Sequence, residues 1–95
     1  YGLGVTLGSY RGLREVRHSG STAGYRAFLT VFPDRRAAVA VLCNGGNAQA
    51  EALTYAVVDR VLAASLTPPA APRRGYTLTE AELNGLAGLY RNTRT

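Results

Sequence analysis

The sequence predicts an α+β fold in which an antiparallel β-sheet carries a helix packed on it. Four segments with strand-like patterns follow one another between short turns, namely residues 1–7, 13–18, 25–32 and 37–43. One longer segment, residues 48–64, has apolar residues at helical spacing. Because tight turns join consecutive strands, neighbouring strands should run antiparallel.

Turn-forming residues separate the predicted strands. Glycines at both ends of residues 8–12 can adopt positive φ, and proline followed by aspartate favours a turn at residues 33–36. Residues 13–18 combine apolar and charged side chains, which is typical of a strand with one exposed face. Residues 19–24 are small and rich in glycine, so they predict a loop.

Residues 37–43 form an uninterrupted apolar run, Ala-Ala-Val-Ala-Val-Leu-Cys. Such a run predicts a strand that is buried on both faces. Helices would then be needed on both sides of the sheet, and this chain offers only one long helix. We therefore expect that part of the protein is missing from this chain, and that the isolated chain associates with itself through a sheet edge or an apolar face.

Helical spacing and breaker residues divide the rest of the chain. A stripe of Leu53, Val57, Val61 and Ala64, widened by Ala50, Val58 and Leu62, predicts the packing side of a helix, and Asn47 is its expected N-cap. Residues 1–64 would thus form one folded unit. Three prolines within residues 68–72 make residues 65–77 an extended linker.

Residues 78–95 are predicted to begin an accessory C-terminal segment. Thr79 and Glu82 have the spacing of a capping box, which predicts a short helix that ends near Leu86. Residues 88–92 look like the start of a further strand.

Composition excludes several classes of function. All eleven basic residues are arginines, and the formal net charge is +5. The arginines are scattered, without interleaved aromatic residues or a reading-helix motif, so nucleic-acid binding is not predicted. No run of about 18 apolar residues predicts a membrane span. No metal-binding or cofactor-binding motif is present, and the single cysteine, Cys43, cannot form an internal disulfide.

The segment most informative about function is His18-Ser19-Gly20-Ser21-Thr22-Ala23-Gly24-Tyr25. It resembles the C-terminal part of the class C β-lactamase and D,D-peptidase family. There a Lys-Thr-Gly triad is followed by Ser-Thr-Gly-Gly-Phe, a strand ending in Pro, a turn, an apolar strand ending in Leu-Ala-Asn, and the C-terminal helix. This chain follows the same order, with Pro33 and Leu42-Cys43-Asn44 at the corresponding places. Tyr1-Gly2-Leu3-Gly4 is similar to the strand that precedes the triad, so the resemblance covers residues 1–64.

The resemblance implies a β-lactamase/transpeptidase-like fold and a serine hydrolase that forms an acyl-enzyme with a peptide, ester or β-lactam carbonyl. His18, Ser19 and Gly20 match the triad, and the backbone N–H of Ser21 matches a donor of the oxyanion hole. The Ser19 hydroxyl would bind a carboxylate or amide of a small-molecule or peptide substrate. Glycine at position 20 would let the substrate approach the backbone. Residues 78–92 would open an accessory β domain.

Two departures from the family pattern change these expectations. The chain has no lysine, so it cannot contain the family's Ser-x-x-Lys motif, and Tyr90-Arg91-Asn92 fits Tyr-x-Asn only by chance. The catalytic Ser, Lys and Tyr are therefore expected in the missing N-terminal part, and this chain alone should be inactive. His18 also replaces the triad lysine, and histidine is mostly neutral near pH 7. This favours peptide or ester hydrolysis over dedicated β-lactamase activity.

Two alternatives remain open from the sequence. In one, residues 18–24 are only a strand end and a glycine loop in an unrelated α+β domain. In the other, the chain is a non-catalytic interaction module that binds a partner through an open sheet edge. The cellular compartment stays open, because relatives of this kind are periplasmic or secreted and also cytoplasmic.

Overall fold

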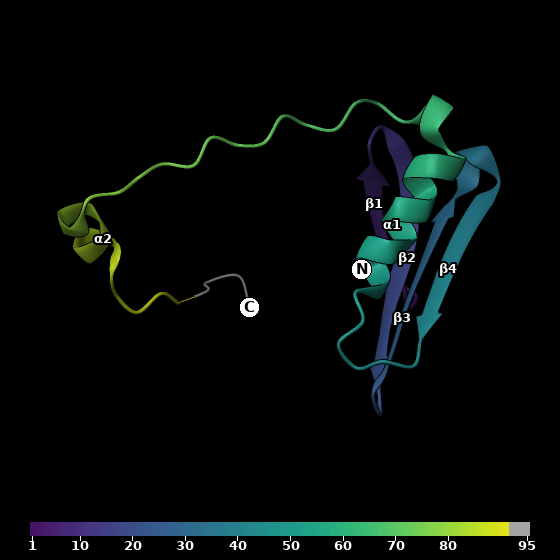
Figure 1. Cartoon of the computed structure of the whole chain (residues 1–95), viewed down its shortest axis with the longest axis horizontal. Helices are drawn as coiled ribbons and strands as arrows, with labels where there is room; N and C mark the ends of the chain where they lie inside the picture. Colours follow the sequence, from purple (N-terminus) through teal and green to yellow (C-terminus); the bar gives the residue numbers. More distant parts are fainter. Residues whose placement is uncertain (92–95) are drawn as a thin grey trace.

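The computed structural model describes residues 1–91, and its main body is a four-stranded antiparallel sheet with one helix against it (Figure 1). The strands follow the chain order across the sheet: β1 (Thr6–Tyr10), β2 (Leu13–Thr22), β3 (Tyr25–Phe32) and β4 (Ala37–Cys43). The helices are α1 (Ala50–Val61) and α2 (Glu80–Leu86), and short 3₁₀ turns lie at Pro33–Arg35 and Ala63–Ser65. The predicted α+β class and the antiparallel pairing are confirmed.

Two tight hairpin turns set the register of the sheet. Arg11 and Gly12 have φ values of 44° and 88°, and Ala23 and Gly24 have values of 44° and 83°. Two successive residues with positive φ are typical of type I′ turns, whose twist matches that of the strands they join. Gly12 also lies close to the chain after α1, since a Cβ there would come within 2.9 Å of Thr67 Cγ2.

Two predicted strand boundaries are wrong. The strand expected at residues 1–7 begins only at Thr6, because residues 2–5 form their own turn, closed by two hydrogen bonds between Gly2 and Val5 at 3.0 and 3.1 Å. The loop expected at residues 19–24 is mostly strand, and β2 continues to Thr22 in register with β3. Small residues tolerate pairing here because only the two turn residues need positive φ.

The core lies between α1 and the face of the sheet that it covers, formed mainly by β3 and β4. Leu13, Phe32 and Val58 make its centre, and partly buried side chains surround them: Tyr10, Val39, Tyr55, Leu62 and Leu66. We call this side of the sheet the covered face. Its main anchor on the helix is Val58, which is fully buried.

The packing side of α1 matches the prediction only in part. Ala50 and Val58 of the expected stripe are buried, together with Thr54, which lies outside it. The other members of the stripe are exposed on the outer side: Leu53, Val57 and Val61. Thr54 can be buried because its hydroxyl donates to the Ala50 carbonyl at 2.8 Å. The expected N-cap at Asn47 is also wrong, since Gln49 occupies the N-cap position without a side-chain capping bond.

The opposite side of the sheet, which we call the open face, is not covered by the described residues. Ala38, Ala40 and Leu42 of β4 are exposed, alternating with partly buried neighbours. The prediction that residues 37–43 are buried on both faces is therefore wrong for this chain by itself. Residues that lie opposite one another on neighbouring strands form rows across the open face. The first row holds Leu7, Val16, Val31 and Ala38. The second holds His18, Leu29 and Ala40, and the third holds Gly20, Ala27 and Leu42.

After α1 the described chain leaves the main body as an extended arm (Figure 1). Every described residue from Thr67 onward is exposed, residues 67–79 are extended, and α2 stands apart from the sheet (Figure 1). The predicted capping box is confirmed: Thr79 Oγ1 accepts from the Glu82 N–H at 3.3 Å, and Glu82 Oε2 accepts from the Thr79 N–H at 2.8 Å. No strand forms at residues 88–91, and residue 92 lies outside the described part.

Candidate functional site

The sequence-predicted site residues lie on the half of β2 that β1 leaves unpaired. β1 pairs with β2 only as far as Thr6 opposite Arg17, whereas β3 continues beside β2 to Thr22. Within residues 1–91, residues 18–22 therefore have a strand neighbour on one side only. We call this the free edge.

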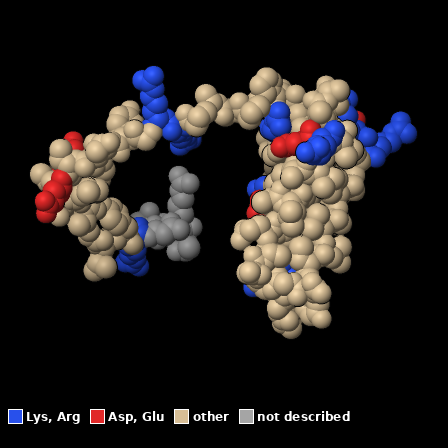
Figure 2. Space-filling view, viewed as in Figure 1, with Lys and Arg blue, Asp and Glu red and all other residues tan. Residues whose placement is uncertain are grey.

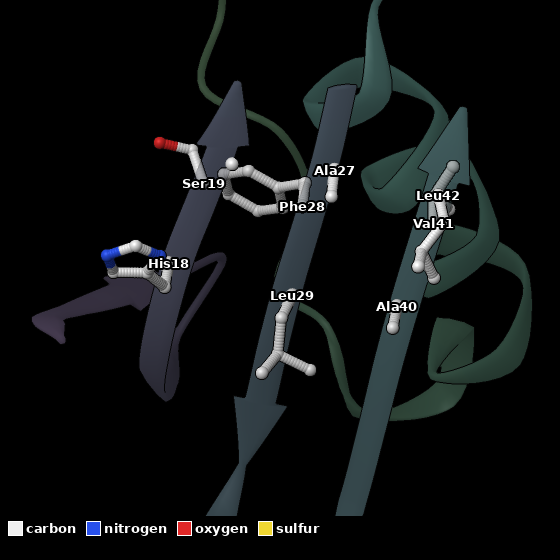
Figure 3. A pocket seen from close by; sticks show the side chains of 9 residues that line it. His18, Ser19, Ala27, Phe28, Leu29, Ala40, Val41 and Leu42 are labelled. Atoms are coloured by element: carbon white, nitrogen blue, oxygen red, sulfur yellow. The ribbon is translucent and has the colours of Figure 1, made fainter. Parts of the chain in front are cut away.

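Alternation along β2 separates the side chains of the predicted site. His18 and Gly20 belong to the open face, and Ser19 and Ser21 belong to the covered face near the start of α1. In Figure 3, His18, Leu29 and Ala40 form one row across three strands. The structure thus brings the four residues together at one edge, but it does not place the His18 imidazole beside the Ser19 hydroxyl.

The hairpin geometry indicates which main-chain groups point to the free edge. In a hairpin with a two-residue turn, the residues flanking the turn exchange hydrogen bonds, and such pairs alternate with non-hydrogen-bonded pairs along the ladder. Thr22 and Tyr25 flank the turn between β2 and β3. Ser21 and Ser19 consequently occupy non-hydrogen-bonded positions toward β3, and their N–H and C=O groups point away from it.

The hairpin between β1 and β2 independently indicates the same direction for the main-chain groups of Ser19 and Ser21. Tyr10 and Leu13 flank its turn, so Leu13 and each second residue as far as Arg17 direct their main-chain groups toward β1. Ser19 and Ser21 continue this alternation beyond the last pair. Their main-chain donors and acceptors therefore face the space past the beginning of β1.

Three shallow hollows surround the free edge. One of about 280 Å³ lies on the open face beside His18, between Leu29 and Leu42 (Figure 3). A second, of about 230 Å³, is lined by Tyr1, Thr6, Arg17, His18, Ser19, Phe28 and Glu51. A third, of about 190 Å³, lies between residues 19–21 and the start of α1. Ser19 and Phe28 border all three, and Ser19 is the polar side chain that the three hollows share.

His18 has a single side-chain contact among the described hydrogen bonds. Its Nε2 lies 3.4 Å from the Tyr1 hydroxyl, and the two rings are tilted with centroids 6.3 Å apart. The described residues contain no group of three or more metal-ligating side chains. The free edge can therefore offer an imidazole, hydroxyls and main-chain donors to a ligand.

A buried polar network that the sequence analysis missed lies directly before the free edge. Glu15 is fully buried, and its Oε1 accepts hydrogen bonds from Thr30 Oγ1 at 2.7 Å and Tyr55 Oη at 2.5 Å. Arg17 Nη1 donates to Tyr55 Oη at 3.0 Å and lies 3.7 Å from Glu15 Oε2. The expectation of an exposed charged face on residues 13–18 is wrong for Glu15. The available signal was its spacing of two from Leu13, a core residue, which puts both on one face.

The chemistry of this network keeps it intact near neutral pH. Burial and the hydrogen bond to Glu15 raise the pKa of Tyr55 to about 12. The hydrogen bond with Tyr55 raises the pKa of Arg17 above its usual value. Tyr55 therefore stays a donor and Arg17 stays charged. Together with Glu15 they hold β2 against α1 immediately before His18.

A second set of contacts extends the network to the turn between β1 and β2. Tyr10 stacks on Tyr55 with ring centroids 4.3 Å apart, and its hydroxyl donates to Asp59 at 2.6 Å. Burial, then the hydrogen bond to Asp59, raises the pKa of Tyr10. Arg11 Nη1 also lies 3.1 Å from Asp59. These contacts fasten α1 to the end of β1 and to the turn between β1 and β2.

Charged side chains gather at the opposite end of the sheet from the β2–β3 turn. Figure 2 shows them near the turns at the upper end in this view, whereas the end with the β2–β3 turn is largely uncharged. No helix within residues 1–91 has the length and apolar character that crossing a membrane requires. No protein-family model, curated protein or solved structure matches the chain.

Proposed function

We propose that this chain forms one wall of the active site of a serine hydrolase that works through an acyl-enzyme, with β2 as the strand that binds the substrate. The observation that carries the proposal is the free edge, where the main-chain groups of Ser19 and Ser21 point outward. An extended substrate can add to such an edge as a further strand. The Ser21 N–H would then donate to the oxygen of the attacked carbonyl, an interaction worth about 3 kcal/mol in the transition state.

The residue between these serines supports the same role. Gly20 does not have a positive φ, and a Cβ on it would meet Ala27 Cβ at 3.4 Å, an ordinary contact. Neither the backbone nor the packing of the sheet therefore requires glycine. A missing side chain does keep the edge accessible to the backbone of a substrate.

The open face offers a surface on which a segment bearing the nucleophile could pack. The chain has no lysine, so the Ser-x-x-Lys motif of the resembled family would come from a segment outside it. We propose that this segment packs on the open face beside His18, because the rows around His18 expose aliphatic side chains such as Leu29 and Leu42. His18 then contributes an imidazole in place of the fixed cation that would favour carboxylate-bearing β-lactams. Peptides and esters are the proposed substrates.

The free edge also supports a second candidate, a non-catalytic module. The same outward main-chain groups would pair with a strand of a partner protein without any chemistry. The two candidates differ in one respect, because only the hydrolase needs a nucleophile on the open face.

Two measurements test the proposal. The 95-residue chain, incubated with nitrocefin and p-nitrophenyl acetate, should give background rates, and the product of the gene read upstream of Tyr1 should turn over the ester. In that longer product, His18→Lys should raise kcat/KM for a cephalosporin relative to a neutral ester, and Arg14→Lys, on the same face, should not. Turnover by the chain alone that is lost in Ser19→Ala would mean that the nucleophile lies in this chain. A start codon directly before Tyr1 would support the module.

A further inference from the structure

Residues 1–5 turn away from the free edge instead of continuing β1 along it. Leu3 and Gly4 have φ values of 52° and 81°. Main-chain hydrogen bonds between Gly2 and Val5, at 3.0 and 3.1 Å, close the turn. Glycine adopts a positive φ readily, whereas leucine is strained there. We call this segment the N-terminal turn, and it is the reason that β1 stops short of the free edge.

The register between β1 and β2 determines where these residues would lie if the N-terminal turn straightened. Continued one residue at a time on each strand, the ladder places Gly4 opposite Ser19. Two residues further on, it places Gly2 opposite Ser21. The outward main-chain groups of the two serines would then pair with the two glycines. Each such pair exchanges two hydrogen bonds, so the straightened chain would form more of them than the two that close the N-terminal turn.

Leu3 has a matching place on the open face. It would share that face with Leu7, because side chains alternate along a straight strand. In the N-terminal turn, the Leu3 side chain is fully exposed. In the straightened chain it would stand opposite Gly20, in the row that continues to Ala27 and Leu42. Glycine and alanine leave room beside it, and this row lines the apolar hollow of about 280 Å³. Straightening would therefore bury apolar surface that the N-terminal turn leaves in water.

We propose that residues 1–5 act as a latch that opens and closes the free edge. In the turned state, the main-chain groups of Ser19 and Ser21 are available to an added strand. In the straightened state, the glycines of the latch use the same groups, and a substrate strand cannot pair there. A ligand that adds to the edge therefore binds only the turned state and favours it. As regulation of the substrate-binding strand, the latch rests on the proposed function.

Each state of the latch carries an opposing cost. The turned state strains Leu3, and among the described hydrogen bonds one side-chain contact ties it to β2, from Tyr1 to His18 at 3.4 Å. The straightened state orders Gly2 and Gly4 in a strand, where glycine is unfavourable because it loses the most conformational freedom. Single substitutions in the N-terminal turn should therefore move the balance in either direction.

Amide chemical shifts of Ser19 and Ser21 in the labelled 95-residue chain measure this balance without any catalysis. Gly4→Val introduces a β-branched residue where the turn requires a positive φ, so it should favour the straightened state about tenfold. Leu3→Asn removes the strained leucine and creates the Asn-Gly pair preferred in type I′ turns, so it should move both shifts the other way along the same line. The matched control, Gly8→Val, adds valine to β1 outside the latch, where a Cβ meets no atom within 4 Å, and should leave both shifts in place.

A direct contact identifies the straightened state. Leu3 and Gly20 would form a non-hydrogen-bonded pair with Cα atoms about 4.5 Å apart, so Gly4→Val should give a nuclear Overhauser effect between their Hα atoms. Its absence, or unchanged shifts of Ser19 and Ser21 in Gly4→Val, would overturn the latch and leave the hydrolase proposal standing. A latch that responds as expected, in a chain whose longer gene product turns over no ester, would retain the latch and reject the hydrolase. In an active longer product, Gly4→Val should lower kcat/KM for the ester, and an unchanged value would overturn the regulatory role of the latch.

Discussion

The two faces of this sheet are built from the same strands, yet they have opposite chemistry. The covered face buries a carboxylate and a threonine, Glu15 and Thr30, beside Phe32. The open face exposes aliphatic side chains such as Leu7, Leu29 and Leu42. What decides burial at each position is therefore the element that covers it, and hydrophobicity of the residue alone does not.

The covered face can bury a carboxylate because α1 and the neighbouring strands bring partners for it. Tyr55 and Thr30 donate to Glu15, and Arg17 supplies the counter-charge. The described residues place no element over the open face. Two substitutions on the same strand, one on the covered face and one on the open face, should therefore change the free energy of unfolding by very different amounts.

The largest contrast is expected within β3. Phe32→Ala removes a fully buried ring from the core centre and should lower the free energy of unfolding by about 3–5 kcal/mol. Leu29→Ala, three residues earlier, removes a side chain that is 43 % exposed and should lower it by less than about 1 kcal/mol. Urea unfolding followed by circular dichroism measures both. Similar losses would show that the open face is covered in solution.

A smaller contrast is expected within β2. Glu15→Ala leaves the Thr30 and Tyr55 hydroxyls without their acceptor and Arg17 without its counter-charge, so unfolding should become easier by about 2–3 kcal/mol. Arg14→Ala on the open face breaks only an exposed ion pair with Asp34 and should cost less than about 1 kcal/mol. Thermal unfolding of the two variants makes the comparison. A stable Glu15→Ala variant would mean that the network adds no net stability.

The network should also make stability fall at alkaline pH. The folded-state pKa of Tyr55 is raised from 10.0 to about 12, so folding favours the protonated phenol. The resulting stability is complete below pH 10 and is lost as the pH rises toward 12. Partial exposure of Tyr55 limits the loss to about 1–2 kcal/mol. Tyr55→Phe should flatten the profile between these values, and Tyr76→Phe, which changes an exposed ring, should not. Equal profiles in both variants would contradict this role for Tyr55.

The sequence predicts those features that depend on local chemistry. The hairpins, the capping box of Thr79 and Glu82, and the antiparallel order follow from turn residues and strand patterns, and the structure contains them. The packing side of α1 is predicted only in part, because the wide apolar stripe contains both Val57 and Val58, and the tertiary fit of Ala50 and Thr54 against the sheet selects Val58.

The candidate site, like the fold, is predicted from the sequence only where local residues determine it. Small residues after His18 mark an accessible segment, but their pattern is typical of a loop as well as of a strand edge, and only the lengths of β1 and β2 reveal the free edge. The buried role of Glu15 depends on Tyr55, which lies 40 residues further along the chain. No local pattern indicates that pairing.

Self-association tests the open face most directly. Of the effects considered, it should change the stability of the chain least. Four strands spaced by about 4.8 Å, with about seven residues each at roughly 3.3 Å per residue, make a patch of roughly 400 Å². Two copies face to face would bury roughly 800 Å², which is below the roughly 1,200–2,000 Å² of stable interfaces. We therefore expect a weak dimer whose population grows with concentration, with the second copy seated on the open face. In the hydrolase proposed above, the segment that bears the nucleophile would cover this face and prevent the association.

Sedimentation velocity between about 10 and 500 μM distinguishes a face-to-face dimer from other contacts, a range suited to interfaces of this weak class. Leu29→Glu places a charge in the middle row of the open face and should keep the chain monomeric, with little change in its unfolding. Leu53→Glu changes an equally exposed leucine on the outer side of α1 and should leave the dimer intact. If Leu53→Glu alone abolished association, the outer stripe of α1 would be the contact. If neither variant altered it, pairing would run through a strand edge, because main-chain hydrogen bonds between edges do not depend on either side chain.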